Sequence, residues 1–130
     1  MQQNMNLIGR ILIGHIFLLA GFNKVGNYAG TQAWMEAMGV PGALLPLVIA
    51  LEIGGALAII LGWKARWAAV ALAGFSVIAA ALFHADFADQ MQMIMFMKNL
   101  AIAGGLLLLA ANGAGALSLD ERRAAQPVSA

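Results

Sequence analysis

Four long apolar runs constrain the fold of this chain more than any other feature. They cover about residues 7–22, 43–61, 67–83 and 91–111, and polar or glycine-rich segments separate them. A helix of about 20 residues, within a range of about 17–25, crosses the hydrocarbon core of a bilayer. With 62% hydrophobic and only 10% charged residues, the chain lies far outside the composition of soluble domains. The sequence therefore predicts an all-α polytopic membrane protein, a four-helix transmembrane bundle.

The charged residues predict how this bundle lies in the membrane. An even number of spans places the N-terminus, the second loop and the C-terminal tail on one side, and these segments hold Arg10, Lys64, Arg66, Arg122 and Arg123. The third loop has two acidic residues and no basic one. Because Lys and Arg gather on the cytoplasmic side, we expect a multi-pass membrane protein with both termini cytoplasmic. We expect one transmembrane domain over residues 1–119 and a polar, frayed cytoplasmic tail over residues 120–130.

The first loop is long for so small a bundle, and it contains a short helical pattern. Thr31 could cap a helix that holds Trp34 and runs to about Met38. This segment is too apolar to extend into water. We therefore expect it to lie in the outer interface or to fold over the mouth of the bundle.

Composition excludes several function classes. A net charge of +1 leaves no basic stripe for nucleic acid. Cysteine is absent, which excludes disulfides, dithiol chemistry, thiolate metal sites and iron–sulfur ligation by this chain. We expect no covalently bound cofactor, so a redox role would require a bound quinone or a cofactor held by a partner protein.

Ionisable residues within the apolar runs are the candidate functional residues. Glu52, Lys98 and His15 lie at similar depth, with Asn99 beside Lys98, Arg10 near the inner end of the first run and Lys24 at the outer rim. A charge inside a span costs about 2.5–3.5 kcal/mol and therefore faces a partner or a cavity. We expect Glu52 to pair with Lys98. Such a pair is either a structural ion pair that sets helix register or part of a polar pocket for a quinone-like ligand or for protons; alternatively, Lys98 snorkels to the interface.

Metal binding is the weaker interpretation of the remaining candidates. His84 and Asp86 lie at the outer rim, where an interfacial hydrogen bond is favoured over a metal or proton role. Four alternating methionines, Met91, Met93, Met95 and Met97, would split between two faces of a helix, which favours adaptable packing over copper. We expect no metal site. The glycine pairs Gly54-Gly55 and Gly104-Gly105 are interpreted as helix-packing faces.

Several motifs together resemble the DoxX family. They are Gly9-Arg10-Ile11-Leu12, Ala20-Gly21-Phe22-Asn23-Lys24, Leu51-Glu52-Ile53-Gly54-Gly55 and Met97-Lys98-Asn99-Leu100-Ala101 with Gly104-Gly105, and they span nearly the whole chain. The resemblance implies a four-helix bacterial inner-membrane protein. Some members of that family form the membrane part of a thiosulfate:quinone oxidoreductase, and others are associated with detoxification or oxidative stress. Carried over to this chain, it points to Arg10, Lys24, Glu52, Lys98 and Asn99.

Three functions are consistent with these residues. The first is a membrane subunit that binds a quinone or another small amphipathic ligand, receives electrons from a partner protein, and is at most part of an oxidoreductase. The second is a non-enzymatic scaffold or assembly subunit in a larger membrane complex. The third, a small-solute transporter, is disfavoured because four helices enclose little volume and transport would require a homo-oligomer.

Overall fold

The computed structural model describes residues 1–126, and within this range every regular element is a helix. The elements are α1 (Gln2–Gly26), α2 (Tyr28–Ala37), a 3₁₀ turn (Gly42–Leu44), α3 (Leu45–Leu61), α4 (Ala65–Phe83), α5 (Gln90–Asn112) and α6 (Leu119–Ala125). Four segments among the described residues are long and apolar enough to cross a membrane: Gln2–Gly26, Gly42–Leu61, Ala65–Phe83 and Gln90–Asn112. The all-α prediction and the four predicted spans are confirmed. The first span is longer than predicted, because the helix continues through Asn23 and Lys24 to Gly26.

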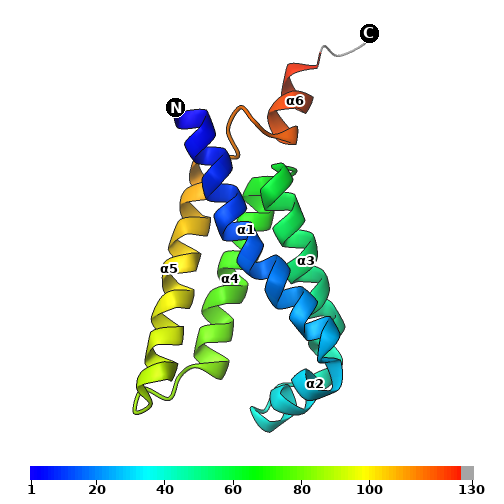
Figure 1. Ribbon diagram of the computed structural model, residues 1–130, viewed down its shortest axis with the longest axis vertical. Coiled ribbons are helices and arrows are strands. Elements are labelled where there is room, and N and C mark those ends of the chain that lie inside the picture. The colour runs from blue at the N-terminus through cyan, green and yellow to red at the C-terminus, as the bar shows by residue number, and fades with distance from the viewer. Residues whose placement is uncertain (127–130) are drawn as a thin grey trace.

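The helices form two closely packed pairs. α1 packs along α3, α4 packs along α5, and α3 also contacts α4. Figure 1 shows α1 crossing the bundle diagonally, near α5 at its N-terminal end and beside α3 at its C-terminal end. The core between the helices is apolar, with Phe17, Ala56, Ile59, Leu72 and Leu106 among its buried side chains.

One face of α1 makes the close contact with α3. The buried residues of α1 are Arg10, Gly14, Phe17 and Gly21, at spacings of four, three and four, which place them on one side of a helix. A Cβ on Gly14 would lie 2.5 Å from Cγ1 of Ile60, and a Cβ on Gly21 would lie 2.5 Å from Cγ1 of Ile53. Both distances are far below van der Waals contact. The two glycines therefore allow the α1 and α3 backbones to approach.

Of the two glycines in each predicted packing pair, one packs against a neighbouring helix and the other does not. A Cβ on Gly55 would meet Leu72 of α4 at 2.9 Å, and a Cβ on Gly105 would meet Cδ1 of Ile13 on α1 at 3.1 Å. Gly54 and Gly104 face open space. In each pair one glycine lies on a packing face, because adjacent helical residues point about 100° apart.

The C-terminal segment is hydrogen-bonded to the end of the bundle that holds the N-terminus. The Arg10 guanidinium donates to the carbonyls of Ile59, Ile60 and Leu117. The carboxylate of Asp120 accepts from the backbone N–H groups of Lys64 (2.7 Å) and Ala65 (3.0 Å), and so caps the start of α4 from a distant part of the chain. The prediction of a frayed tail is wrong for residues 120–125, which belong to α6 (Leu119–Ala125). Residues 127–130 of that predicted tail lie outside the described residues.

The short helix α2 lies at the opposite end of the bundle (Figure 1). Its placement over the bundle mouth agrees with the prediction. Thr31 does not cap it: α2 begins at Tyr28, after Asn27 leaves helical geometry with φ −128°, and the Thr31 hydroxyl donates to the Asn27 carbonyl. The indole of Trp34 stacks on the ring of Phe83 at the end of α4, with centroids 4.5 Å apart.

The close approach of α1 to α3 can be tested with two single-methyl substitutions. We expect Gly21→Ala to lower the free energy of unfolding by about 1–3 kcal/mol, because the new methyl group overlaps Ile53. Gly104→Ala is the matched control, since a Cβ there meets nothing within 4 Å. Reversible SDS unfolding in mixed micelles measures both. Equal stability of the two variants would contradict this packing.

The long-range cap on α4 gives a second test. We expect Asp120→Ala to cost about 1 kcal/mol, a typical value for a lost N-cap. It should also speed hydrogen exchange at the amides of Lys64 and Ala65. Glu121→Ala, one residue along α6, should leave these amides protected. Unchanged exchange in Asp120→Ala would show that α6 does not cap α4.

Candidate functional site

The site is built around Glu52, a carboxylate in the middle of α3. Glu52 is 1% exposed and lies seven residues after Leu45, roughly 10 Å along the helix axis. In a helix of this apolar character an unpaired carboxylate would be costly. The position of Glu52 therefore requires a compensating group from another helix.

That group is Lys24. Its Nζ lies 2.8 Å from Oε1 and 3.1 Å from Oε2 of Glu52, so the ammonium contacts both carboxylate oxygens. Lys24 follows Gly21 by three residues and so lies on the face of α1 that packs against α3. A Cβ on Gly21 would lie 3.5 Å from Cβ of Glu52, which places this glycine directly beside the pair.

The predicted pair of Glu52 with Lys98 is wrong. Lys98 is exposed on α5, and in residues 1–126 no hydrogen bond or ion pair is formed by its side chain. Its neighbour Asn99 is half-buried and faces the interior. The two residues point about 100° apart on the helix, so only one of them can face inward.

A cavity of about 210 Å³ lies beside the Lys24–Glu52 pair. Five helices contribute to its wall. The lining residues are Ile16, Phe17, Ala20, Lys24, Thr31, Trp34, Met35, Val48, Glu52, Phe75, Ser76, Ala79, Phe83, His84, Asn99 and Ile102. An apolar wall with a few convergent polar groups is the usual composition of a small-molecule site.

Some polar side chains of the cavity already form hydrogen bonds within the protein, and one does not. The Ser76 hydroxyl, from α4, donates to the Leu72 carbonyl at 2.8 Å. Nδ1 of His84 lies 2.9 Å from Oε1 of Gln92. Asn99 forms no side-chain hydrogen bond with the described residues, so its amide can donate to and accept from a bound molecule.

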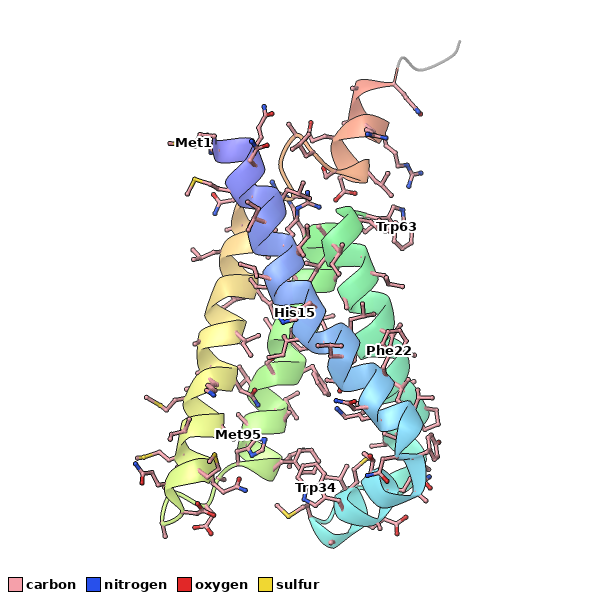
Figure 2. All side chains as sticks on the ribbon, in the orientation of Figure 1. Met1, His15, Phe22, Trp34, Trp63 and Met95 are labelled. Atoms are coloured by element: carbon pink, nitrogen blue, oxygen red, sulfur yellow. The ribbon has the colours of Figure 1, made fainter. Side chains whose placement is uncertain are left out.

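Besides Lys98, three predicted site residues lie away from the cavity. Arg10 is buried at the other end of the bundle, where its guanidinium binds backbone carbonyls. His15 is exposed halfway along α1, with Nδ1 against the Leu12 carbonyl of the preceding turn (Figure 2). Asp86 lies in the α4–α5 loop, where its carboxylate accepts from the Ala88 amide. The predicted pocket is therefore reduced to Lys24, Glu52 and Asn99, with His84 from the predicted rim.

Sequence reasoning missed the aromatic part of the wall. Phe17, Phe75, Phe83 and Trp34 line the cavity from α1, α4 and α2. Figure 2 shows Trp34 extending from α2 toward the end of α4. Only Phe17 carried a signal, because it lies four residues before Gly21 on the glycine face of α1. The other three depend on helix rotations that the sequence pattern does not specify.

Metal ligands do not gather in the described part of the chain. Residues 1–126 contain no group of three or more His, Asp or Glu side chains that could hold an ion. Met91, Met93, Met95 and Met97 are exposed on α5 rather than directed at one point.

The two lysines provide a direct test of the pairing. We expect Lys24→Met to destabilise the protein by about 3–5 kcal/mol, because it leaves the Glu52 carboxylate buried without its counter-charge. Lys98→Met should change stability by less than about 0.5 kcal/mol, since an exposed, unpaired side chain is replaced. SDS unfolding in mixed micelles measures both. A larger loss for Lys98→Met than for Lys24→Met would restore Lys98 as the partner of Glu52.

Comparisons with known proteins agree with the fold and its motifs. The DoxX family model matches residues 5–85, which begin within α1, end just after α4 and include both members of the ion pair. The inner membrane protein YqjF of Escherichia coli K12 is 55% identical over 114 residues, covering 88% of each chain. The inner membrane protein YphA of the same organism is 38% identical over 123 residues, covering 89% of this chain and 88% of the relative. No solved structure gives a significant match. The chain belongs to the DoxX family, and its relatives are inner membrane proteins.

Proposed function

We propose that this chain is an inner-membrane subunit that binds the ring of a quinone, or of a similar small amphipathic molecule, beside the Lys24–Glu52 pair. One observation carries the proposal: an ion pair within apolar helices lines a cavity whose other walls are largely aromatic and aliphatic. A purely structural ion pair would be stabilised most by close packing on all sides. Here one side of the pair faces a space.

The size of the cavity suits one ring. An engineered apolar cavity of about 150 Å³ holds benzene. A cavity of about 210 Å³ is therefore large enough for a single substituted ring and is below the usual range of about 300–1,000 Å³ for sites that enclose drug-sized ligands. A ligand with a small head and a long tail would place only its head here.

The polar groups match the chemistry of a quinone. The Lys24 ammonium and the Asn99 amide can donate to the carbonyl oxygens of the ring, and the aromatic side chains provide faces for stacking. Reduction of a quinone to a quinol takes up two electrons and two protons. The Lys24 ammonium can pass one proton to a quinone carbonyl oxygen, and the second proton would come from water. The two electrons would come from a partner protein with its own redox group, because this chain has no cysteine.

The membrane orientation is part of the proposal. Arg10, Lys64 and Arg66 lie beside the C-terminal segment, since Arg10 contacts Leu117, Lys64 contacts Asp120 and Arg66 lies next to Gly113. This end of the bundle also holds the N-terminus and α6 (Figure 1). The positive-inside rule puts this end in the cytoplasm. Both termini would then be cytoplasmic, residues 1–119 would form the membrane domain, and the cavity would lie in the outer half of the bilayer.

A scaffold function remains the rival proposal. Lys24 and Glu52 join α1 to α3, so their pair can serve assembly of the bundle without any ligand. The two proposals predict different results for a variant that fills the cavity with a larger side chain and keeps the Lys24–Glu52 pair. Filling the space would abolish ligand binding and would leave a scaffold intact.

The experiment is analysis of co-purified lipids by native mass spectrometry and solvent extraction, after purification in mild detergent. We expect wild-type protein to retain a quinone, and Glu52→Gln to retain at least tenfold less. Because Glu52→Gln also disturbs the pair, Ala79→Leu is the second variant: it adds bulk to the cavity wall without touching either charge. Ala81→Leu, on the exposed side of the same helix, is its control and should retain the quinone.

The outcomes separate the two proposals. Loss of quinone in Ala79→Leu, with stability unchanged, would support a ligand site. Wild-type protein that carries no quinone and binds none on addition would contradict the proposal. A bare protein that co-purifies with another polypeptide would favour the scaffold.

A further inference from the structure

The cavity has two sides by which a molecule could reach it. One side is the end of the bundle beneath α2, and the other is the seam between α1 and α5. The distinction matters because the first side leads to water at the membrane surface and the second leads to lipid. The structure distinguishes them by what covers each one.

The end beneath α2 is covered by aromatic side chains. Trp34 of α2 stacks on Phe83 at the C-terminal end of α4, with an interplanar angle of 24°. Met35, also on α2, is buried and lines the cavity. A hydrophilic molecule that came from this end would have to separate the stacked rings.

The seam between α1 and α5 is open beside the cavity. The two helices run antiparallel and meet where Ile13 touches Gly105. Moving along α1 from that contact, the cavity is lined by Ile16 and Ala20, about one and two turns further on. Moving back along α5 by the same amounts, it is lined by Ile102 and Asn99.

The edges of this seam belong to both the cavity and the outer surface. Ile16 lines the cavity and is 44% exposed, and Ala20, Asn99 and Ile102 are only half-buried. Figure 1 shows why: α1 crosses diagonally toward α3, so it departs from α5 below their contact. Three of the four edge residues are apolar, which suits contact with hydrocarbon.

We propose that the cavity opens sideways into the bilayer between α1 and α5, and that its ligand arrives from the membrane with an apolar tail that stays in the lipid. The identity of the polar ring as a quinone rests on the proposed function. The lateral opening is argued from the geometry of the seam alone. The ligand class is an amphiphile with a small polar ring and a long hydrocarbon chain. The tail would pass between Ile16 and Ile102 while the ring contacts Lys24, Glu52 and Asn99.

The absence of cysteine allows a direct test with a single thiol. Ser76→Cys places it on the cavity wall at a position that is 3% exposed, with little change in volume. Two maleimides are compared on the protein in lipid nanodiscs, one with a long alkyl chain and one sulfonated and membrane-impermeant. We expect the alkyl maleimide to label Ser76→Cys at least tenfold faster. Asp86→Cys, in the exposed α4–α5 loop, should show the reverse preference and confirms that the sulfonated reagent is active.

Blocking variants identify the route. In the Ser76→Cys background, Ala20→Trp should slow labelling by the alkyl maleimide at least tenfold, and Thr31→Trp, on the α2 side, should not. Ile102→Trp blocks the same seam from α5 and replaces Ala20→Trp if that variant fails to fold. Faster labelling by the sulfonated reagent, or blockage by Thr31→Trp alone, would overturn the lateral opening. So would a thiol that reacts with neither reagent in the folded protein but reacts after unfolding.

This test does not depend on quinone. Lateral labelling in a protein that binds no quinone would refute the proposed headgroup and keep the opening. Quinone binding together with labelling from the water side would support the proposed ligand and refute the lateral opening.

Discussion

The ion pair between Lys24 and Glu52 is the interaction on which the arrangement of this bundle depends. A carboxylate in the middle of an apolar helix needs a counter-charge, and Lys24 contacts both of its oxygens. The pair forms only because α1 and α3 approach closely at Gly21, one turn before Lys24. The same face of α1 carries Arg10 fourteen residues earlier, so one helical face supplies a buried cation near one end of the bundle and a half-buried cation, Lys24, toward the other. Close packing and charge neutralisation are therefore two results of one sequence pattern.

The two ends of the bundle differ in structure: one is joined by hydrogen bonds, and the other contains a cavity. At the end that holds the N-terminus, Arg10 binds three carbonyls, and Asp120 caps α4. These contacts join α1, α3, α4 and the C-terminal segment. Within residues 1–126, Nε of Arg10 is the one buried side-chain nitrogen or oxygen without a hydrogen-bond partner. At the other end, α1 departs from α5, and a space remains beside Glu52. In the proposed function, the first end holds the helices together and the second end admits the ligand.

The sequence predicted the helices well and the site only in part. Length and hydropathy locate the four spans, and they place Glu52 near the middle of one of them. They do not determine the rotation of one helix against another, which decides whether Lys24 or Lys98 faces Glu52. The prediction also ended the first span at residue 22, whereas the helix continues to Gly26 and brings Lys24 onto the packing face. Helix α6 was missed because its anchor, Asp120, caps a helix more than fifty residues away in sequence. The aromatic wall depends on three helices at once, and no local pattern specifies it.

The most direct measurement of the central claim is solid-state NMR of the protein in lipid bilayers, with ¹⁵N in lysine side chains and ¹³C in glutamate carboxyl groups. The chain has only three lysines and three glutamates, so each signal can be assigned by substitution. We expect a strong dipolar coupling between Nζ of Lys24 and the Glu52 carboxyl carbon, and a shift of both signals when a quinone is added. A coupling of Glu52 to Lys98 would contradict the ion pair between Lys24 and Glu52. Lys24 and Glu52 signals that do not shift when the quinone is added would contradict the role of this pair in ligand binding.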